Sequence, residues 1–315
     1  MKRLAGEVTR ALFGPEHTWG YRQRAEREAA DLPMRLEDAL RWSTTAVCCS
    51  TDRPIFILSA GWRSGSTLLQ RMIMQHNSKL LIWGEPFNMG HILDGMISQF
   101  KGFNAAWPKK SHFLSKRGNG VLAQQWVANL YPDVDDLFQA NLAFLDRLFA
   151  QPARAAGYAQ WGVKEVRWTI EHAIFLRRLY PNCKIIFLCR DPFDSYASYY
   201  RICDGWFFHW PDQPIATPYA FGRCWARLAQ GYLKGHKMVD GLLVRYEDLS
   251  KPATVERLND YLGWPVSAAS SLERVTGDTA DRSRGNVVDL PYIDRFLLDM
   301  AVGRTRAAVG YPAIE

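Results

Sequence analysis

The stretch that most constrains the fold is Pro54–Met74, PIFILSAGWRSGSTLLQRMIM. Its apolar run at Ile55–Ser59 predicts a buried strand, and a loop containing two glycines follows at Ala60–Ser66. Apolar residues then predict a helix over Thr67–Met74. Strand, glycine-containing loop and helix, in that order, form a phosphate-binding loop, because glycine lets the backbone turn sharply and approach a ligand. The stretch therefore predicts an α/β fold with an anion site at this loop.

The residues of the loop indicate which anion it can bind. Unsatisfied amides and the positive end of the helix dipole meet at a helix N-terminus. Here those amides belong to Gly65, Ser66, Thr67 and Leu68. Arg63 adds a guanidinium that can hold two oxygens of a phosphate or sulfate. A nucleotide-hydrolysing loop has lysine where this chain has Ser66, and glycine where it has Ala60. The loop therefore argues against ATP or GTP hydrolysis.

A second motif lies at Lys184–Arg201, KIIFLCRDPFDSYASYYR. Ile185–Cys189 is a continuous apolar run, which predicts a buried parallel strand. Arg190 follows this strand directly, and Ser198 comes eight residues later (198 − 190) on a predicted helix. A guanidinium pairs well with a phosphate dianion, and a hydroxyl can add a hydrogen bond. The motif therefore predicts a second anion-binding pair.

The loop sequence GWRSGSTLL resembles the 5′-phosphosulfate loop of sulfotransferases that use 3′-phosphoadenosine 5′-phosphosulfate (PAPS). Within this family, the chain resembles the bacterial type of enzyme, which is similar to carbohydrate and tyrosylprotein sulfotransferases. The resemblance implies that PAPS is the donor and PAP the product, and that Arg190 and Ser198 bind the 3′-phosphate. It also implies a set of residues around the 5′-phosphosulfate: Arg63, Ser64, Gly65, Ser66, Thr67 and Leu68. Tyr246-Glu-Asp-Leu249 is similar to a downstream element of the family, which we interpret as structural.

Two further residues are expected near the reacting group. The apolar run at Lys79–Trp83 predicts a strand, and Glu85 lies in the turn directly after it. Parallel sheets place their sites at the carboxyl ends of their strands. In tyrosylprotein and several carbohydrate sulfotransferases a similarly placed glutamate is the catalytic base or lies beside the acceptor. Lys164, in WGVKEVR, is in a position where the family often has a lysine that reaches the donor phosphates or the leaving group. A surface turn for Glu85 and a solvated lysine at Lys164 are the alternatives.

Weaker candidates complete the predicted site. Many cytosolic small-molecule sulfotransferases use a histidine base, so His91, His112 and His209 remain alternatives to Glu85. The segment Asp281–Asn286 is similar to a loop that closes over the 3′-phosphate and adenine in many family members. Its candidate donor-binding residues are Arg282, Arg284 and Gly285. A solvated loop is the alternative interpretation of that segment.

Composition bounds the class of protein. The chain has 315 residues, is 48% hydrophobic and 23% charged, and carries a net charge of +7. These values are typical of a globular protein with an anionic ligand. Basic residues are scattered, so we expect no nucleic-acid partner. Six cysteines without a C-x-x-C pair indicate a reducing compartment and no metal. The absence of a long apolar run or signal peptide predicts a cytoplasmic protein without a membrane span.

Periodicity predicts the remaining organisation. Asn88–Lys116 shows no clean period and predicts an acceptor-side loop. Ala123–Ala150 predicts helices with a core stripe at Phe138, Leu142, Leu145 and Leu148. We expect residues 1–50 to form a helical and loop extension packed on the core. Residues 51–315 should form one P-loop-like domain, a mainly parallel sheet flanked by helices, with acceptor-binding loops.

The predicted function is transfer of a sulfuryl group from PAPS to a hydroxyl or amine, without a metal. A carbohydrate or glycosylated metabolite is the preferred acceptor, because Gly-Glu-Pro-Phe resembles the E-P turn of carbohydrate sulfotransferases. A tyrosyl peptide or a phenolic small molecule is the alternative acceptor. A P-loop kinase and a non-catalytic protein that binds PAPS or PAP are alternatives from other classes.

Overall fold

The computed structural model describes residues 32–41, 49–85, 89–104, 107–114, 120–202, 209–210, 213–215, 217–268 and 290–312. The chain divides into two compact units. The first comprises Met1–Cys48 and Gly95–Ala140, and the second comprises Cys49–Asp94 and Asn141–Glu315. Most of the predicted N-terminal extension, residues 1–50, lies outside the described residues. Its packing on the core therefore stays a prediction.

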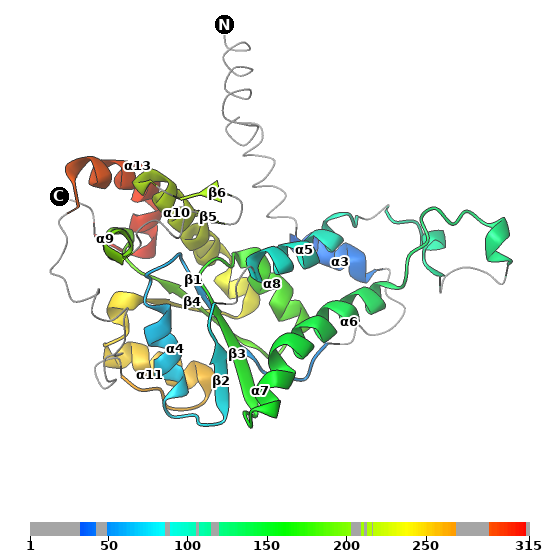
Figure 1. Ribbon diagram of the computed structural model, residues 1–315, viewed down its shortest axis with the longest axis horizontal. Coiled ribbons are helices and arrows are strands. Elements are labelled where there is room, and N and C mark those ends of the chain that lie inside the picture. Colours follow the sequence, from blue (N-terminus) through cyan, green and yellow to red (C-terminus); the bar gives the residue numbers. More distant parts are fainter. Residues whose placement is uncertain are drawn as a thin grey trace, which may run out of the picture. The chain divides into compact units, whose positions relative to one another are not determined.

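A five-stranded parallel sheet forms the centre of the second unit (Figure 1). Its strand order is β2-β3-β1-β4-β7, and each neighbouring pair is parallel. The strands are β1 (Ile55–Ser59), β2 (Leu80–Trp83), β3 (Gln160–Glu165), β4 (Lys184–Cys189) and β7 (Leu242–Arg245). All of β1 and nearly all of β4 is buried, as expected of continuous apolar strands covered on both faces. The predicted α/β fold with a mainly parallel sheet is confirmed.

Helices surround this sheet. They are α4 (Ser66–Met74), α7 (Gln151–Ala155), α8 (Ile170–Leu179), α9 (Pro192–Ile202), α10 (Pro218–Gly235), α11 (Pro252–Leu262) and α13 (Tyr292–Val309). Aliphatic residues of the sheet pack with Leu69 of α4 and Leu258 of α11 on one face. An aromatic group that includes Phe56 and Phe187 forms a second buried cluster. Helix α13 packs against α10 and so completes the unit beside the end of β4.

Strand β3 was not predicted, because polar residues interrupt its apolar pattern. Its sequence is QWGVKE, yet Lys164 and Glu165 are both buried. Gly162 lies against β1, where any Cβ would overlap the carbonyl oxygen of Ile55. The strand therefore forms because its charged side chains are paired with opposite charges and because glycine lets two backbones approach closely.

The first unit contains α3 (Leu32–Leu40) and parts of α5 (Met89–Lys101) and α6 (Val134–Leu145). Two short 3-10 turns, at Lys110–His112 and Leu122–Gln124, lie between α5 and α6. Phe100 stacks on Phe138 at a centroid distance of 4.5 Å, and Arg35 donates to the carbonyl oxygen of Phe103 at 2.9 Å. The prediction of a loop over Asn88–Lys116 was wrong for the part that forms α5.

A π-helical turn corrects the predicted core stripe. This turn covers Asp146–Ala150 and joins α6 to α7. Leu145 and Phe149 are buried, whereas Leu148 is exposed, so the prediction was wrong for Leu148. The hydrogen bonds of a π-helix span five residues, which widens the turn and brings the next position to the core. Trp83 of β2 donates to the carbonyl oxygen of Phe149 at 3.1 Å and so ties this turn to the sheet.

Candidate functional site

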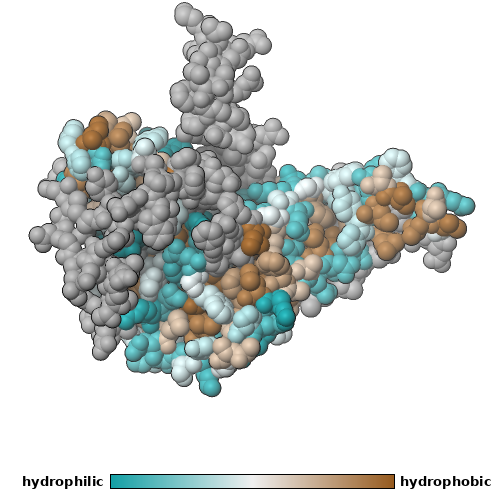
Figure 2. Space-filling view, in the orientation of Figure 1, coloured by the Kyte–Doolittle hydropathy of each residue, from teal (hydrophilic) through white to brown (hydrophobic). Residues whose placement is uncertain are grey.

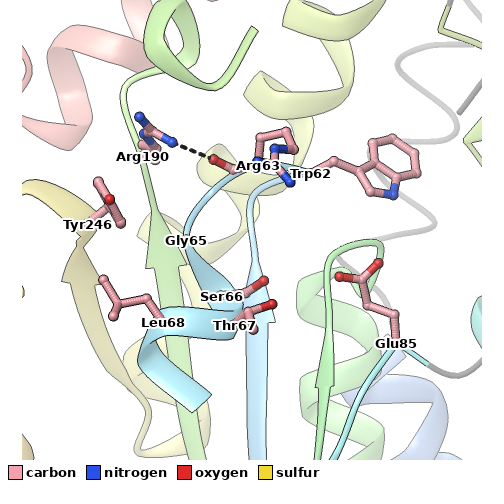
Figure 3. A pocket seen from close by; sticks show the side chains of 9 residues that line it. All are labelled: Trp62, Arg63, Gly65, Ser66, Thr67, Leu68, Glu85, Arg190 and Tyr246. Carbon is pink, nitrogen blue, oxygen red and sulfur yellow. Dashed lines mark hydrogen bonds between the residues drawn. The ribbon is translucent and has the colours of Figure 1, made fainter. Parts of the chain in front are cut away.

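A cleft of ≈ 260 Å³ opens at the carboxyl ends of the parallel strands (Figure 3). Its lining residues are Trp62, Arg63, Gly65, Ser66, Thr67, Leu68, Glu85, Arg190 and Tyr246. They follow β1, β2, β4 and β7, at the edge where α/β sheets place their ligands. The volume is near the lower end of small-molecule sites, which is about 300 Å³. Seven of the nine lining residues were predicted, so motifs distant in sequence meet in one cleft.

The predicted phosphate-binding loop connects β1 to α4. Gly61 and Gly65 both have a φ of 83°, and Arg63 has a φ of 61°. A non-glycine residue in the left-handed region costs conformational energy, so the loop holds Arg63 in a strained shape. Helix α4 begins at Ser66, one residue earlier than predicted, and Gly65 is its N-cap. The first amides of α4 therefore lie at the cleft with the positive end of the helix dipole.

The loop serines differ in their environment. Ser66 and Thr67 line the cleft, whereas the Ser64 side chain is fully buried and does not line it. Within the described part of the chain, Ser64 Oγ has no hydrogen-bond partner. A contribution of Ser64 to an anion site therefore comes from its backbone.

Gly65 lies directly against Tyr246, the first residue after β7. A Cβ at Gly65 would overlap the ring carbons of Tyr246. The ring also lies under Arg190, whose guanidinium carbon is 4.5 Å from the ring centroid. Such cation–π contact orients an arginine without using its hydrogen-bond donors. Tyr246 was interpreted only as a structural element, so its place in the cleft wall was missed.

The two predicted anion-binding groups are directly connected. Arg63 Nε donates to Ser198 Oγ at 3.1 Å. Arg190 Nη1 donates to the carbonyl oxygen of Arg63 at 2.9 Å (Figure 3). Trp225 of α10 donates to the carbonyl oxygen of Arg190 at 3.0 Å. Arg190 Nε is buried and has no partner among the described residues. Buried donors are normally satisfied, so this Nε is a donor whose hydrogen bond is not made within the described residues.

Glu85 and Lys164 form an ion pair across neighbouring strands. Lys164 Nζ lies 2.6 Å from Glu85 Oε1. The lysine side chain is 5% exposed and the glutamate side chain 32%. The alternative of a solvated surface lysine is therefore excluded for Lys164. Glu85 lies two residues beyond β2, with a carboxylate that lines the cleft.

Glu165, the next residue of β3, forms a separate ion pair with Arg167. Glu165 is fully buried, and Arg167 donates to its two carboxylate oxygens at 2.9 Å each. Burial by itself lowers the pKa of Arg167, but the hydrogen bond and the negative charges of Glu165 and Glu85 raise it overall. Since successive strand residues point to opposite faces, Lys164 is directed to Glu85 while Glu165 is directed to Arg167.

A polar clamp holds the end of β4 beside Arg190. Asp191 pairs with Arg306 of α13, with Nη2 and Oδ2 2.6 Å apart. The backbone amide of Asp191 donates to Glu247 Oε1 at 2.9 Å, and Tyr311 donates to Glu247 Oε2 at 3.0 Å. The residues of α13 were not predicted to take part in the site. Its arginine is nine tenths buried, which a sequence pattern alone does not reveal.

The weaker candidates have different outcomes. His112 is buried in the first unit, where its Nδ1 accepts from the amide of Lys109 at 3.3 Å and its ring packs on Trp107. These contacts give His112 a packing role. The side chains of His91 and His209 are not described, although their backbones lie in α5 and β5 (His209–Trp210). The loop candidates Arg282, Arg284 and Gly285 lie outside the described residues.

The described residues contain neither a metal-binding cluster nor a membrane-spanning helix. No group of three or more His, Cys, Asp or Glu side chains in the described ranges is placed to hold a metal ion. Among the described helices, none combines the length and apolar composition that a membrane span requires.

One family model matches the chain. The family model described as "Sulfotransferase family" matches residues 54–268. No curated protein matches the chain. Similar solved structures include a sulfotransferase domain from the curacin biosynthetic pathway, with 20% identity, a TM-score of 0.46, and coverage of 84% of this chain and 99% of that one.

Two others are the sulfotransferase domain of the Synechococcus PCC 7002 olefin synthase and a mouse sulfotransferase complexed with PAP. The first is 21% identical, has a TM-score of 0.43 and covers 82% of this chain and 97% of its own. The second is 14% identical, has a TM-score of 0.40 and covers 87% and 90%. At these levels the assignment rests on the family model, which spans more than half of the chain. The chain belongs to the sulfotransferase family and is an enzyme of sulfuryl transfer.

Proposed function

We propose that this enzyme transfers the sulfuryl group of PAPS to a hydroxyl or amine of its acceptor, with Glu85 as the general base. PAPS is the donor typical of the family. In the proposed division of labour, the loop amides and Arg63 hold the phosphosulfate. Arg190 and Ser198 hold the 3′-phosphate, and Lys164 lies beside Glu85 close to the leaving oxygen.

The chemistry of the cleft fits an anionic donor. Two guanidinium groups and the N-terminus of α4 lie around one cleft, and Arg190 Nε is a buried donor without a partner among the described residues. Such groups bind phosphate and sulfate oxygens strongly because the hydrogen bonds are charge-assisted. PAPS supplies the activated sulfuryl group when it is bound. The chain itself offers no lysine at the position that a nucleotide-hydrolysing loop requires.

The Lys164–Glu85 pair is the observation that carries the proposal. It fixes a carboxylate in the cleft wall at a defined orientation, and only one of its oxygens is in the pair at 2.6 Å. In the proposed step, Glu85 takes the acceptor proton while the acceptor oxygen or nitrogen forms its bond to sulfur. The bond from sulfur to the bridging oxygen breaks, and the electron pair stays on the PAP phosphate. Preorganised donors near that oxygen stabilise the growing charge.

A binding experiment tests the donor site. PAP and adenosine 5′-phosphate, which lacks the 3′-phosphate, are titrated calorimetrically into wild type, Arg190→Ala and the control Arg227→Ala. Arg227 is an exposed arginine of α10 outside the cleft. We expect PAP to bind wild type and the control at least tenfold more tightly than adenosine 5′-phosphate, and Arg190→Ala to lose this preference. Equal binding of the two nucleotides to wild type would contradict the proposed donor site.

A turnover experiment tests the class of acceptor. Labelled PAPS is incubated with acceptor panels of sugars, glycosylated metabolites, phenols and tyrosyl peptides. We propose a carbohydrate or glycosylated metabolite as acceptor, and the resemblance of Gly84-Glu85-Pro86-Phe87 to the E-P turn of carbohydrate sulfotransferases supports this choice. Sulfation of only the phenols or only the peptides would replace the acceptor class and keep the donor site. A kinase would instead transfer phosphate from ATP.

A further inference from the structure

The segment between α5 and α6 exposes a group of large apolar side chains. This apolar segment comprises residues 107–114 and 120–131 of the first unit. Trp126 is 71% exposed, Val121 62% and Leu114 52%. Further exposed members are Trp107, Leu122, Val127, Leu130 and Tyr131. Single exposed apolar residues are normal, whereas a group on one segment indicates an interaction surface.

Two parts of this segment, at Leu114 and at Tyr131, lie side by side. The amide of Leu114 donates to the carbonyl oxygen of Tyr131 at 3.1 Å, and Phe113 and Tyr131 form a parallel bridge. Trp126 Nε1 donates to Asn129 Oδ1 at 3.0 Å, which holds the indole on the surface. In Figure 2 hydrophobic residues gather over this segment, which Figure 1 colours green beyond α5.

The chain from residue 107 to 131 carries charge of one sign, and Asp133, Asp135 and Asp136 follow it. Between Asp94 and Asp133 the chain has no acidic residue, although 32 acidic residues occur in the 315 of the chain. Its basic residues in that interval are Lys101, Lys109, Lys110, Lys116 and Arg117. Lys109 and Lys110 are exposed beside the apolar group. The segment therefore combines exposed apolar side chains with exposed positive charge.

Helix α13 provides a contrast within the same chain. Its exposed apolar residues are Tyr292, Ile293, Phe296 and Met300. This stripe has similar exposure, but two acidic residues, Asp294 and Asp299, outnumber the one basic residue within it, Arg295. Apolar exposure alone is thus not specific to the segment between α5 and α6. The combination with positive charge is.

We propose that the apolar segment docks on the surface of a membrane that contains anionic lipids. Tryptophan and tyrosine are favoured at the membrane–water interface, and lysine is attracted to anionic headgroups. Either attraction alone gives weak binding, whereas the two together anchor a peripheral protein. A nucleic acid would use the positive charge but leave the apolar group in water. A second copy of this chain would bury the apolar group but bring like charges together.

Vesicle co-sedimentation of the full chain tests this proposal. The probes are phosphatidylcholine vesicles with and without phosphatidylglycerol. We expect binding only to the anionic vesicles, and a steep loss of binding as salt is raised. The double variant Val121→Ser/Trp126→Ser should reduce the partition coefficient by about tenfold or more. Lys109→Gln/Lys110→Gln should reduce it by roughly fivefold per lysine.

Matched variants act as controls. Phe296→Ser/Met300→Ser on α13 and Lys234→Gln/Lys237→Gln on other exposed positions should bind vesicles as wild type does. Because the substituted side chains are exposed, thermal unfolding should change little, and a variant with a lowered Tm is replaced by the single substitution. Equal losses for the control variants would overturn the proposal.

Other occupants give different results. Absence of vesicle binding, with a dimer in sedimentation equilibrium that Val121→Ser/Trp126→Ser converts to monomer, would assign the surface to a second copy. Binding to single-stranded DNA that depends on Lys109 and Lys110 but not on Trp126 would assign it to nucleic acid. Either result overturns membrane docking. None of these readouts depends on sulfuryl transfer or on PAP.

Discussion

Lys164 Nζ lies 2.6 Å from Glu85 Oε1, although the two residues are 79 positions apart in the chain. Each residue was predicted to act at the reacting group, and the structure pairs Lys164 of β3 with Glu85, two residues beyond the neighbouring strand β2. A buried ammonium is costly unless an opposite charge lies beside it. The carboxylate of Glu85, the proposed base, therefore also stabilises the buried ammonium of Lys164.

This coupling predicts different effects for the two partners. Glu85→Gln should lower kcat by about 100-fold or more, since general-base catalysis contributes at least that much. It should leave PAP affinity nearly unchanged, and rapid-quench kinetics with calorimetry measure both. Lys164→Met removes the buried charge and keeps the volume, so it should fold but also lose turnover. A Glu85→Gln enzyme with wild-type kcat would exclude Glu85 as the base.

Gly65 and Gly61 make a matched pair, because both have a φ of 83° but only Gly65 contacts Tyr246. Gly61→Ala meets no atom within 4 Å, so it should cost only the backbone penalty of about 1–2 kcal/mol. Gly65→Ala should cost more and should abolish PAP binding, since Tyr246 and Arg190 must move. Urea unfolding and calorimetry measure the two effects. Similar losses of PAP binding in both variants would show that the Tyr246 contact is unimportant.

The Arg306–Asp191 ion pair predicts that α13 helps to hold Arg190 in place at the proposed donor site. Arg306→Met leaves the mostly buried Asp191 carboxylate without this partner, which should lower the free energy of unfolding by about 3 kcal/mol. PAP affinity should also fall, because Asp191 directly follows Arg190. Arg304→Met changes an exposed arginine of the same helix and should change neither quantity. Equal behaviour of the two variants in urea unfolding would remove the proposed support.

The cysteines predict a pattern of labelling. Burial raises the pKa of Cys183 and of Cys189 to about 12, and that of Cys224 to about 11. Because the thiolate is the nucleophile, these three should resist iodoacetamide at pH 8 until the protein unfolds. Cys49 is exposed and should react in the native state. Peptide mapping by mass spectrometry measures each site, and fast native labelling of Cys189 would contradict its burial.

Asp248 predicts one contribution to acid stability. The hydrogen bond from Arg245 is the main cause that lowers its pKa, although burial opposes the shift, and Lys251 lowers it further. A lowered native pKa means that the contribution is present above the unfolded-state value of about 4 and is lost as the pH falls below it. Asp248→Asn should therefore lose more stability at pH 7 than at pH 3. Asp260→Asn, at an exposed position of α11, is the matched control substitution.

The sequence was sufficient for those parts of the fold that have uniform patterns. The continuous apolar runs of β1 and β4 allow few alternatives to buried parallel strands, and the glycines between β1 and α4 determine the loop. Strand β3 could not be recognised, because its burial of Lys164 depends on Glu85, which lies far away in sequence. Helix α5 was missed despite a usable signal, since Leu93, Met96, Ile97 and Phe100 have helical spacing and are all buried.

The candidate site was predictable where one motif supplies several groups. Arg63 and the amides of α4 come from one loop, so they could be recognised together. Tyr246 was missed because its function arises from contact with Gly65 and Arg190 on other strands. The clamp of Arg306 was missed because a helix far along the chain reaches the end of β4. Contacts between distant segments leave no periodic pattern in a sequence.

The strand order itself has a consequence for how such an enzyme can diversify. The cleft residues follow the order of the strands, with Glu85 beside β2, the loop after β1 in the middle, and Arg190 and Tyr246 toward β7 (Figure 3). Adjacent strands are about 4.8 Å apart, so the two edges of the sheet are separated by roughly 19 Å. If the residues have the proposed roles, the acceptor is activated near the β2 edge of the sheet and the nucleotide is bound toward the β7 edge. New acceptor preferences can therefore arise at the β2 margin by local substitution, while the nucleotide margin remains untouched.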